Sequence, residues 1–469
     1  LYNMPIPLEV KSIVKKLEKA KFEAFVVGGC VRDMITGKTP YDWDITTNAI
    51  PEDIIKLFPK TFYENTYGTV GVVNENTEDE TLKIIEVTPY RIESTYSDFR
   101  RPDSVSFHAS LEDDLKRRDF TINAMALRQT GKNKQEIIDL FDGQVDLKAK
   151  IIRTVGNPQD RFNEDALRML RALRLHAELE FSIEPNTQKA IKDNACLLEK
   201  IAKERIRDEF VRIIMSDRPM ETIRMAQKLG ILKYIIPELE KSIGVEQNQA
   251  HSYDVWEHLL RSLQHSADKK WSLDIRLAAL LHDISKPETR RWAEDKKEWT
   301  FYGHDVVGSR VTAKILTRLA FSKKIVEKVA KMVRWHMFFS DTEQITLSAV
   351  RRMIVNVSRE NIWDLMNLRI CDRIGTGRPK EDPYRLRKYK SMIEEALTDP
   401  VSVGMLKIDG KRIMEVTHVT QGPKIGQILN TLLEEILENP SLNTREYLEK
   451  KAKELIKLSD IELKKIGEE

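Results

Sequence analysis

Two carboxylates one residue apart, Asp42 and Asp44, are the first side chains of this sequence whose spacing could perform chemistry. They lie in a short apolar segment that is expected to form a strand. Alternation along a strand would direct both carboxylates to the same face. Two negative charges that close are costly unless a cation lies between them, and Mg²⁺ prefers such oxygen ligands. The alternative interpretation of the pair is a solvated strand face.

A glycine turn precedes this acid pair. The apolar run at 25–27 is typical of a short strand, and Gly28 and Gly29 follow it directly. Two glycines allow the backbone to turn sharply and to approach a phosphate group closely. Arg32 comes about one helical turn later, where its guanidinium could bind a phosphate oxygen. Each feature alone could be structural, but together with the acid pair they indicate nucleotidyl transfer.

A third carboxylate, Glu86, lies in a strand expected at 82–87, after another strand expected at 70–73. Because apolar residues flank Glu86, it is either half of a cross-strand salt bridge or a third carboxylate beside the acid pair. Residues 91–107 are polar and contain several aromatic residues. They are expected to form a long mobile loop, and loops of this length inside a domain are usually functional.

The segment LEDDLKRRDFTINAMAL (111–127) is expected to begin as a helix with acids in its first turn. After them, Arg118 could bind a triphosphate, and Asp119 and Asn123 could bind sugar hydroxyls. The alternative is an exposed ladder of acids and arginines three and four residues apart, which would only stabilise the helix.

The segment from 161 to 181 has the apolar spacing of an amphipathic helix. Four charged residues share its other face: Asp165, Arg168, Arg171 and Arg174. An aspartate beside an arginine presents acceptors and donors together, as reading the edge of a base requires. An isolated pair would more often be a surface salt bridge. Three arginines behind one acid favour base recognition.

The second half of the sequence carries histidines and aspartates on several predicted helices. They are, in chain order, His258, His282, Asp283, His304, His336 and Asp372. Imidazoles and carboxylates gathered from several helices are the material of a metal site in a helix bundle. A single histidine on a helix more often has a structural role, but a His-Asp dipeptide after the apolar run LAALL is unusual.

The elements that position these residues must belong to several domains, because 469 residues predict roughly three to four of them. The formal charge is only +3, so a nucleic-acid partner would need local basic patches, such as the helix expected at 203–214. There is no apolar run that could span a bilayer and no secretory signal. The three cysteines show no pair spacing, which predicts a reduced, cytoplasmic protein. Since no segment could span a bilayer, no membrane partner is expected.

Three motifs in this order, GGCVRD…DWD, LEDDLKRRDFTINA and RFNEDALRMLRALR, resemble the bacterial class II tRNA nucleotidyltransferases and poly(A) polymerases of the polymerase-beta-like superfamily. The resemblance covers about the first half of the chain. It implies two Mg²⁺ ions on Asp42 and Asp44, with Glu86 as the third catalytic carboxylate. It also implies nucleotide contacts by Gly29, Arg32, Arg118, Asp119, Asn123, Asp165, Arg168, Arg171 and Arg174.

The histidine and aspartate pattern of the second half resembles the HD phosphohydrolase superfamily. This resemblance implies that His258, His282, Asp283 and Asp372 bind one divalent metal, either a transition metal or Mg²⁺. His304 and His336 could support a second ion. A tandem HD domain favours the CCA-adding members of the first family over the poly(A) polymerases.

Together these resemblances predict an α+β protein with a small mixed-sheet head and a long all-α body. The expected parts are a nucleotidyltransferase head (1–150), a helical nucleotide-recognition and RNA-binding neck (151–240), an HD phosphohydrolase-like domain (241–375) and a helical tRNA-binding tail (376–469). The implied reaction is template-independent addition of C, C and A to a tRNA 3′ end from CTP and ATP. For the HD domain, an additional phosphohydrolase activity and a role in stabilising the fold alone both stay open.

Two alternatives stay open. An enzyme that adds only A would share the same base-reading motif, whereas the presence of residues 91–107 argues against one that adds only C. In the second alternative, the chain is an HD phosphohydrolase whose N-terminal half is an inactive RNA-binding module. The intact Asp42, Asp44 and Arg118 argue against it, because an inactive site has no need of them.

Overall fold

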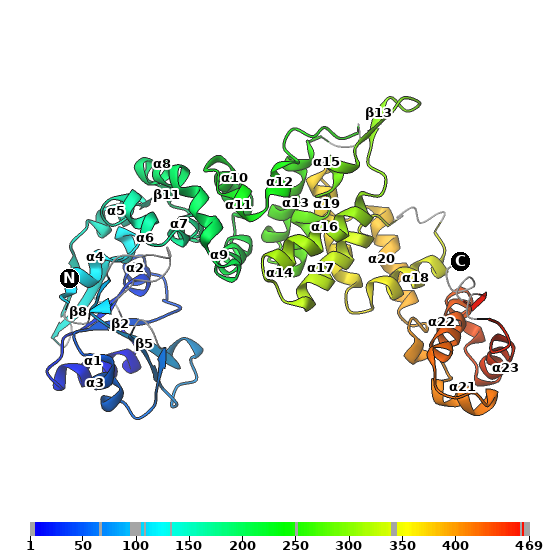
Figure 1. Ribbon diagram of the computed structural model, residues 1–469, viewed down its shortest axis with the longest axis horizontal. Helices are drawn as coiled ribbons and strands as arrows, with labels where there is room; N and C mark the ends of the chain where they lie inside the picture. The colour runs from blue at the N-terminus through cyan, green and yellow to red at the C-terminus, as the bar shows by residue number, and fades with distance from the viewer. Residues whose placement is uncertain are drawn as a thin grey trace. The chain divides into compact units, whose positions relative to one another are not determined.

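The computed structural model describes residues 5–459 and 462–463, apart from 65–67, 94–104, 107–108, 132–133, 249–251 and 339–344. The chain forms two compact units, Leu1–Pro237 and Glu238–Glu469, which Figure 1 colours from blue to green and from green to red. In the described parts of the chain, every helix is too short or too polar to cross a membrane.

The first unit begins with a seven-stranded mixed sheet in the order β3-β4-β5-β2-β1-β8-β9. β2 and β5 pair in parallel, and the other neighbouring strands pair antiparallel. The strands are β1 (Ala24–Val27), β2 (Asp44–Thr47), β3 (Thr61–Glu64), β4 (Thr69–Val73), β5 (Ile84–Pro89), β8 (Met125–Gly131) and β9 (Lys134–Asp139). The helices of this head are α1 (Leu8–Lys19), α2 (Gly29–Ile35), α3 (Pro51–Leu57), α4 (Leu111–Lys116) and α5 (Gly143–Ala149). The predicted mixed-sheet head is therefore confirmed.

The acid pair does not lie wholly on a strand. β2 begins at Asp44, which pairs with Val27, the last residue of β1. The chain turns away at Gly28, so Asp42 has no partner strand and lies in the turn before β2. The prediction that alternation along one strand orients both carboxylates is therefore wrong, and the turn before β2 sets the direction of Asp42 instead.

Residues 91–107 were expected to form one long loop. Their described parts include two short strands, β6 (Ile92–Glu93) and β7 (Val105–Ser106), which pair antiparallel. The predicted mobility concerns residues that lie mainly outside the described part of the chain. The strand expected at 82–87 begins later, at Ile84, because residues 80–82 form a turn of 3₁₀ helix.

The second half of the first unit is helical. Its helices are α6 (Pro158–Glu164), α7 (Leu167–Leu179), α8 (Pro185–Asn194), α9 (Lys203–Met215), α10 (Pro219–Lys228) and α11 (Leu232–Ile235). The single helix expected over 161–181 is interrupted, because Asp165 has an extended backbone (φ −142°). Its carboxylate accepts the backbone N–H of Leu167 at 3.0 Å and so caps α7 instead of continuing the helix.

The second unit is almost entirely helical, as predicted for the body. Its helices are α13 (Val255–Asp268), α14 (Leu273–Leu281), α15 (Lys286–Thr289), α16 (His304–Arg318), α17 (Lys323–Trp335), α18 (Leu347–Val357), α19 (Ile362–Gly375), α20 (Tyr384–Ala396), α21 (Gly410–Thr417), α22 (Pro423–Glu438) and α23 (Arg445–Leu455). A hairpin of β12 (Arg291–Ala293) and β13 (Glu298–Thr300) projects from these helices beyond α15 (Figure 1).

Close contact between α13 and α19 depends on one glycine. A Cβ added at Gly375 would lie 2.7 Å from the backbone oxygen of His258 on α13. The same two helices carry His258 and Asp372, which belong to the predicted metal site. The small residue at 375 therefore sets the distance between the elements that bring these two side chains together.

We expect Gly375→Ala to destabilise the second unit by about 1–3 kcal/mol, because the added methyl group overpacks a helix contact that backbone atoms limit. Urea unfolding followed by circular dichroism measures this change. The matched control is Gly426→Ala on α22, where an added Cβ meets nothing within 4 Å. That substitution should stabilise its helix by about 0.5–1 kcal/mol. Equal midpoints for the two variants would contradict the expected role of Gly375.

Candidate active sites

A pocket of about 630 Å³ in the first unit gathers most residues that the sequence predicts for nucleotidyl transfer. The predicted residues that line it are Gly29, Arg32, Asp42, Asp44, Arg118, Asp119, Asn123, Asp165, Arg168, Arg171 and Arg174. They come from the turn after β1, the start of β2, the segment between α4 and β8, and the region of α6 and α7. The pocket thus joins segments that lie more than 100 residues apart in the chain.

The carboxylates of this pocket differ in their surroundings. Burial raises the pKa of Asp44 above its ordinary value, the nearby Arg118 lowers it, and the negative charge of Asp42 raises it further. Glu86 does not line the pocket and is exposed. It lies directly opposite Asp44 in the parallel pair of β2 and β5, so the two side chains lie on the same face of the sheet.

The glycine turn packs tightly against charged side chains. Gly28 has φ +88°, and an added Cβ would lie 3.2 Å from Nη1 of Arg118 and 3.4 Å from Oδ2 of Asp44. A side chain at this position would therefore be strained and would crowd the pocket. One helical turn later, Nη1 of Arg32 donates to Oδ1 of Asn123 at 2.7 Å. Two residues that the sequence predicts to contact a nucleotide are thus linked directly.

A buried carboxylate supports the arginines of this pocket. Asp114 on α4 has no exposed surface and lies 2.6 Å from Nη2 of Arg117 and 3.2 Å from Nη2 of Arg118. The hydroxyl of Thr46 on β2 donates to the same carboxylate at 3.1 Å. Burial alone raises the pKa of Asp114, but the two arginines outweigh burial, so its pKa lies below the ordinary value. Sequence reasoning considered Asp114 only as part of an exposed ladder of acids and arginines, and the burial of Asp114 excludes that interpretation.

Two further ion pairs fix arginines of α7. Asp119 is buried and lies 2.8 Å from Nη2 of Arg171. Burial raises the pKa of Asp119, but Arg171 and then Arg168 outweigh it and lower the pKa below its ordinary value. Arg174 lies 3.1 Å from Glu209 on α9, a residue that the sequence motifs did not single out. Asp119 is therefore already paired with a cation in the protein itself.

The predicted base-reading residues are each held by a neighbour. Nη2 of Arg205 on α9 lies 2.8 Å from Oδ2 of Asp165. Nη1 of Arg168 lies 2.5 Å from Glu164, and its Nη2 donates to the backbone oxygen of Arg117 at 3.0 Å. Sequence reasoning missed Arg205 and Glu164. The basic helix expected at 203–214 was a signal for Arg205, although it was interpreted as an RNA-tracking surface.

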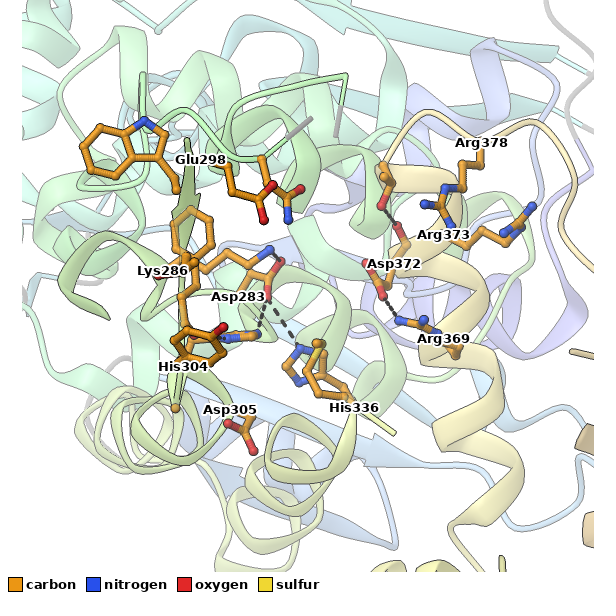
Figure 2. A pocket seen from close by; sticks show the side chains of 18 of the residues that line it. Asp283, Lys286, Glu298, His304, Asp305, His336, Arg369, Asp372, Arg373 and Arg378 are labelled. Carbon is orange, nitrogen blue, oxygen red and sulfur yellow. Dashed lines mark hydrogen bonds and ion pairs between the residues drawn. The ribbon is translucent and has the colours of Figure 1, made fainter. Parts of the chain in front are cut away.

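A second cluster forms in the second unit from the six histidines and aspartates that the sequence predicts. They make two groups that could each hold a metal ion, His258 with His282 and Asp372, and Asp283 with His304 and His336. The prediction placed Asp283 with the first group and gave His304 and His336 to a second ion. The side chains come from five helices or their ends, and Figure 2 shows the second group with Asp372 across the pocket.

Asp283 belongs to both groups by distance. Its Oδ2 lies 3.1 Å from Nε2 of His258 and 3.4 Å from Nε2 of His282. Its Oδ1 lies 3.2 Å from Nε2 of His304 and 3.5 Å from Nε2 of His336. Each oxygen of the carboxylate therefore faces one histidine pair, and Oδ2 also lies 2.7 Å from Nζ of Lys286.

The histidine orientations fit metal binding. Nδ1 of His304, His336 and His282 lies 2.6, 2.6 and 3.0 Å from a backbone oxygen one turn earlier. A carbonyl partner requires a proton on Nδ1, so the lone pair of Nε2 points into the cluster. Burial lowers the pKa of His282 to about 3, which keeps it neutral. Oδ1 of Asp283 and Nε2 of His304 and His336 are buried without a well-formed hydrogen bond, as expected of atoms oriented toward a cation.

Family models match three parts of the chain. The Poly A polymerase head domain matches residues 24–153, the probable RNA and SrmB-binding site of polymerase A matches 180–243, and the HD domain matches 255–365. The first and third matches contain the two clusters described above. Domains of both kinds usually bind divalent metals.

Curated relatives and a solved structure extend the similarity over nearly the whole chain. The CCA-adding enzyme of Leuconostoc mesenteroides is 33% identical over 96% of each chain. That of Ligilactobacillus salivarius is 34% identical over 96% of this chain and 98% of its own. The crystal structure of the Bacillus stearothermophilus CCA-adding enzyme with CTP is 26% identical, with a TM-score of 0.70 over 96% of this chain and 98% of the other.

We expect Asp114→Asn to destabilise the first unit by about 3 kcal/mol, because it leaves Arg117 and Arg118 without their buried counter-charge. Since the folded pKa of Asp114 lies below its ordinary value, this stability is present above about pH 4 and is lost as the pH falls further. Urea unfolding between pH 3 and 7 (about the carboxylate range) measures both effects. The control Glu112→Gln removes an exposed charge of the same helix and should change little. A pH dependence equal to that of the unmodified protein would contradict the assignment.

Proposed function

The chain belongs to the family of CCA-adding enzymes, and on this premise we propose that its first unit adds C, C and A to the 3′ end of tRNA from CTP and ATP without a template. One observation carries the proposal: the acid pair, Asp42 and Asp44, lines the same pocket as Asp165 and Arg168. The reacting phosphate and the base of one nucleotide could therefore be held at the same time. The relative that was solved with CTP supports CTP as a ligand of this pocket.

We propose that Asp42 and Asp44 hold two Mg²⁺ ions, with Glu86 as the third carboxylate. When bound, such ions activate the 3′-hydroxyl and neutralise the leaving pyrophosphate. Asp44 fits this role because burial raises its pKa, so its charged form gains from a nearby cation. Gly29, Arg32 and Arg118 would contact the triphosphate, and Asp119 and Asn123 the sugar.

Base selection follows from donors and acceptors on Asp165 and Arg168. Cytosine and adenine both offer an exocyclic amine donor beside a ring-nitrogen acceptor, so a carboxylate and a guanidinium can pair with either base. Guanine and uracil present the opposite polarity and would be rejected. Arg205 and Glu164 hold these two side chains in place, which supports selection by a preformed edge. Arg171 and Arg174 would add nucleotide or phosphate contacts.

For the second unit we propose a metal-dependent phosphohydrolase activity. The observation that favours it is Asp283, whose two oxygens face different histidine pairs within 3.5 Å. Two divalent ions bound there would supply Lewis-acid and water-activating chemistry. The protein residues would hold the ions: His258, His282 and Asp372 on one side, and His304 and His336 on the other.

The boundaries expected from the sequence remain part of this proposal: head 1–150, neck 151–240, HD domain 241–375 and tail 376–469. The division of the chain after Pro237 supports the boundary between neck and HD domain. A cytoplasmic location is proposed as well, in keeping with the substrates. The tail would bind the body of the tRNA.

Full CCA addition is tested by extension of three tRNA transcripts that end before the first C, after one C and after both. Each is incubated with Mg²⁺ and with CTP, ATP or both. We expect all three to be extended to CCA, because one pocket accepts both bases. Extension of the transcript ending in CC alone would make the enzyme an A-adding one, and no extension would contradict the proposed function of the first unit.

Asp42→Ala serves as the matched control in this assay. It should abolish nucleotide addition, since the acid pair loses a metal ligand, and it should leave hydrolysis by the second unit unchanged. Loss of both activities would indicate misfolding, which circular dichroism would detect.

Asp283→Asn tests the HD site. We expect the variant to lose both divalent ions, because an amide is a weaker metal ligand than a carboxylate. Its hydrolysis of bis-p-nitrophenyl phosphate should fall by at least about 100-fold. Metal content is measured by mass spectrometry of the purified protein. His336→Gln, which removes a ligand of one group only, should lose one ion. Unchanged metal content in Asp283→Asn would contradict the bridging role, while nucleotide addition should persist in both variants.

A further inference from the structure

The HD cluster opens into a pocket of about 1020 Å³, much more space than two ions and a phosphate group need. Figure 2 shows its two sides. His304, His336 and Lys286 lie around Asp283 on one side, and Arg369, Arg373 and Arg378 lie across the pocket. The volume of the pocket and its basic lining residues indicate an anionic ligand that extends beyond the metal cluster.

One wall of this pocket comes from the β12–β13 hairpin and the residues after it, and it carries aromatic rings, Lys296 and the acids Glu298 and Asp305. The guanidinium of Arg290 lies 3.7 Å from the ring centre of Trp299, and Trp292 packs edge-on against the same ring at 5.1 Å. Tyr302 is 76% exposed, and its hydroxyl lies 2.9 Å from Nζ of Lys296. Trp299 is half-buried and Tyr302 is exposed, and aromatic rings beside cations are the elements on which unpaired bases stack.

The opposite wall holds positive charge without matching acids. Arg369 pairs with Asp372 at 2.5 Å, and Nε of Arg373 donates to the backbone oxygen of Lys380. Among the described residues, no carboxylate forms an ion pair with Arg373 or Arg378. Partial burial lowers the pKa of Arg373, and the charges of Arg378 and Arg369 lower it further. These cations repel one another, so an anion between them would stabilise the wall.

We propose that the hairpin and this arginine wall bind the end of a single-stranded RNA, with bases on Trp299 and Tyr302 and phosphates along Arg373 and Arg378. A duplex would hide its bases from the rings, so the strand must be unpaired. A pocket of about 1020 Å³ has room for more than one nucleotide, so a strand can place a base on one wall and phosphates along the other. The binding of RNA does not depend on the proposed HD function. Only the hydrolysis of a phosphate at the end of the RNA, near Asp283, rests on it.

Photo-crosslinking of the full chain tests the binding site without relying on catalysis. The probe is a short single-stranded oligoribonucleotide with a 3′-phosphate and a 4-thiouridine next to its 3′ end. We expect mass spectrometry to find crosslinks on the hairpin peptide that contains Trp299 and Tyr302. Arg378→Glu on the opposite wall should reduce these crosslinks at least about fivefold, because it replaces a phosphate contact by repulsion.

The control variant is Lys323→Glu, which reverses an 88% exposed charge of the same unit outside the pocket. It should leave the hairpin crosslinks unchanged. Adenosine 3′-monophosphate competes in a further arm. If it removes the crosslinks at the same concentration as unlabelled oligonucleotide, the ligand is a free nucleotide, and the proposed binding of an RNA strand is overturned.

Hydrolysis of bis-p-nitrophenyl phosphate is followed in parallel. Hairpin crosslinks without any hydrolysis would contradict the proposed HD activity and leave the RNA site supported. Hydrolysis with crosslinks confined to residues 1–237, or with crosslinks that Arg378→Glu does not reduce, would overturn the RNA site and leave the HD activity supported.

Discussion

A carboxylate removed from water needs cations or hydrogen-bond donors close to it, and the architecture of the first unit depends on this requirement at Asp114. This side chain has no exposed surface, yet it receives two arginines and the hydroxyl of Thr46. Through Thr46 it joins α4 to β2, the strand that begins with Asp44. One buried charge therefore positions two parts of the pocket. It holds Arg118, which lies against the glycine turn, and it is bonded to the strand that begins with Asp44.

The same requirement is met differently in the two units. In the first pocket, Arg171, Arg174 and Arg205 each have a carboxylate of the protein within about hydrogen-bonding distance. Such pairs fix side-chain geometry before a ligand arrives, which suits recognition of a base edge by shape and polarity. In the HD cluster, the buried carboxylate Asp283 has one fixed counter-charge, Nζ of Lys286 at 2.7 Å, and otherwise faces four imidazoles. Imidazoles gathered beside a carboxylate are suited to binding cations from solution.

The sequence motifs predicted most of the candidate site residues but not the residues that form ion pairs with them, such as Arg205 and Glu164. The resemblance of the sequence motifs to known families predicted the mixed-sheet head and the helical body. The motifs also predicted eleven of the residues that line the first pocket, whereas the predicted Glu86 does not line it. They could not predict that the helix is interrupted at Asp165. The interruption depends on the local backbone, which lets the Asp165 carboxylate accept the N–H of Leu167 and cap α7. Nor could they assign Arg205 or divide the HD cluster, because those contacts join helices that are distant in the chain.

The position of Asp283 between the two groups of the HD cluster determines how many ligands each metal ion could have. With Asp283 in one group, a single ion would have four ligands and the two remaining histidines would be accessory. If two ions bind as proposed, His258, His282 and Asp372 would hold one and His304 and His336 the other, with Asp283 close to both. Loss of one ion would then change the charge balance at the other, so the two sites would be coupled through one side chain. Occupancy of both ions would also draw anionic ligands toward the arginine wall that faces them.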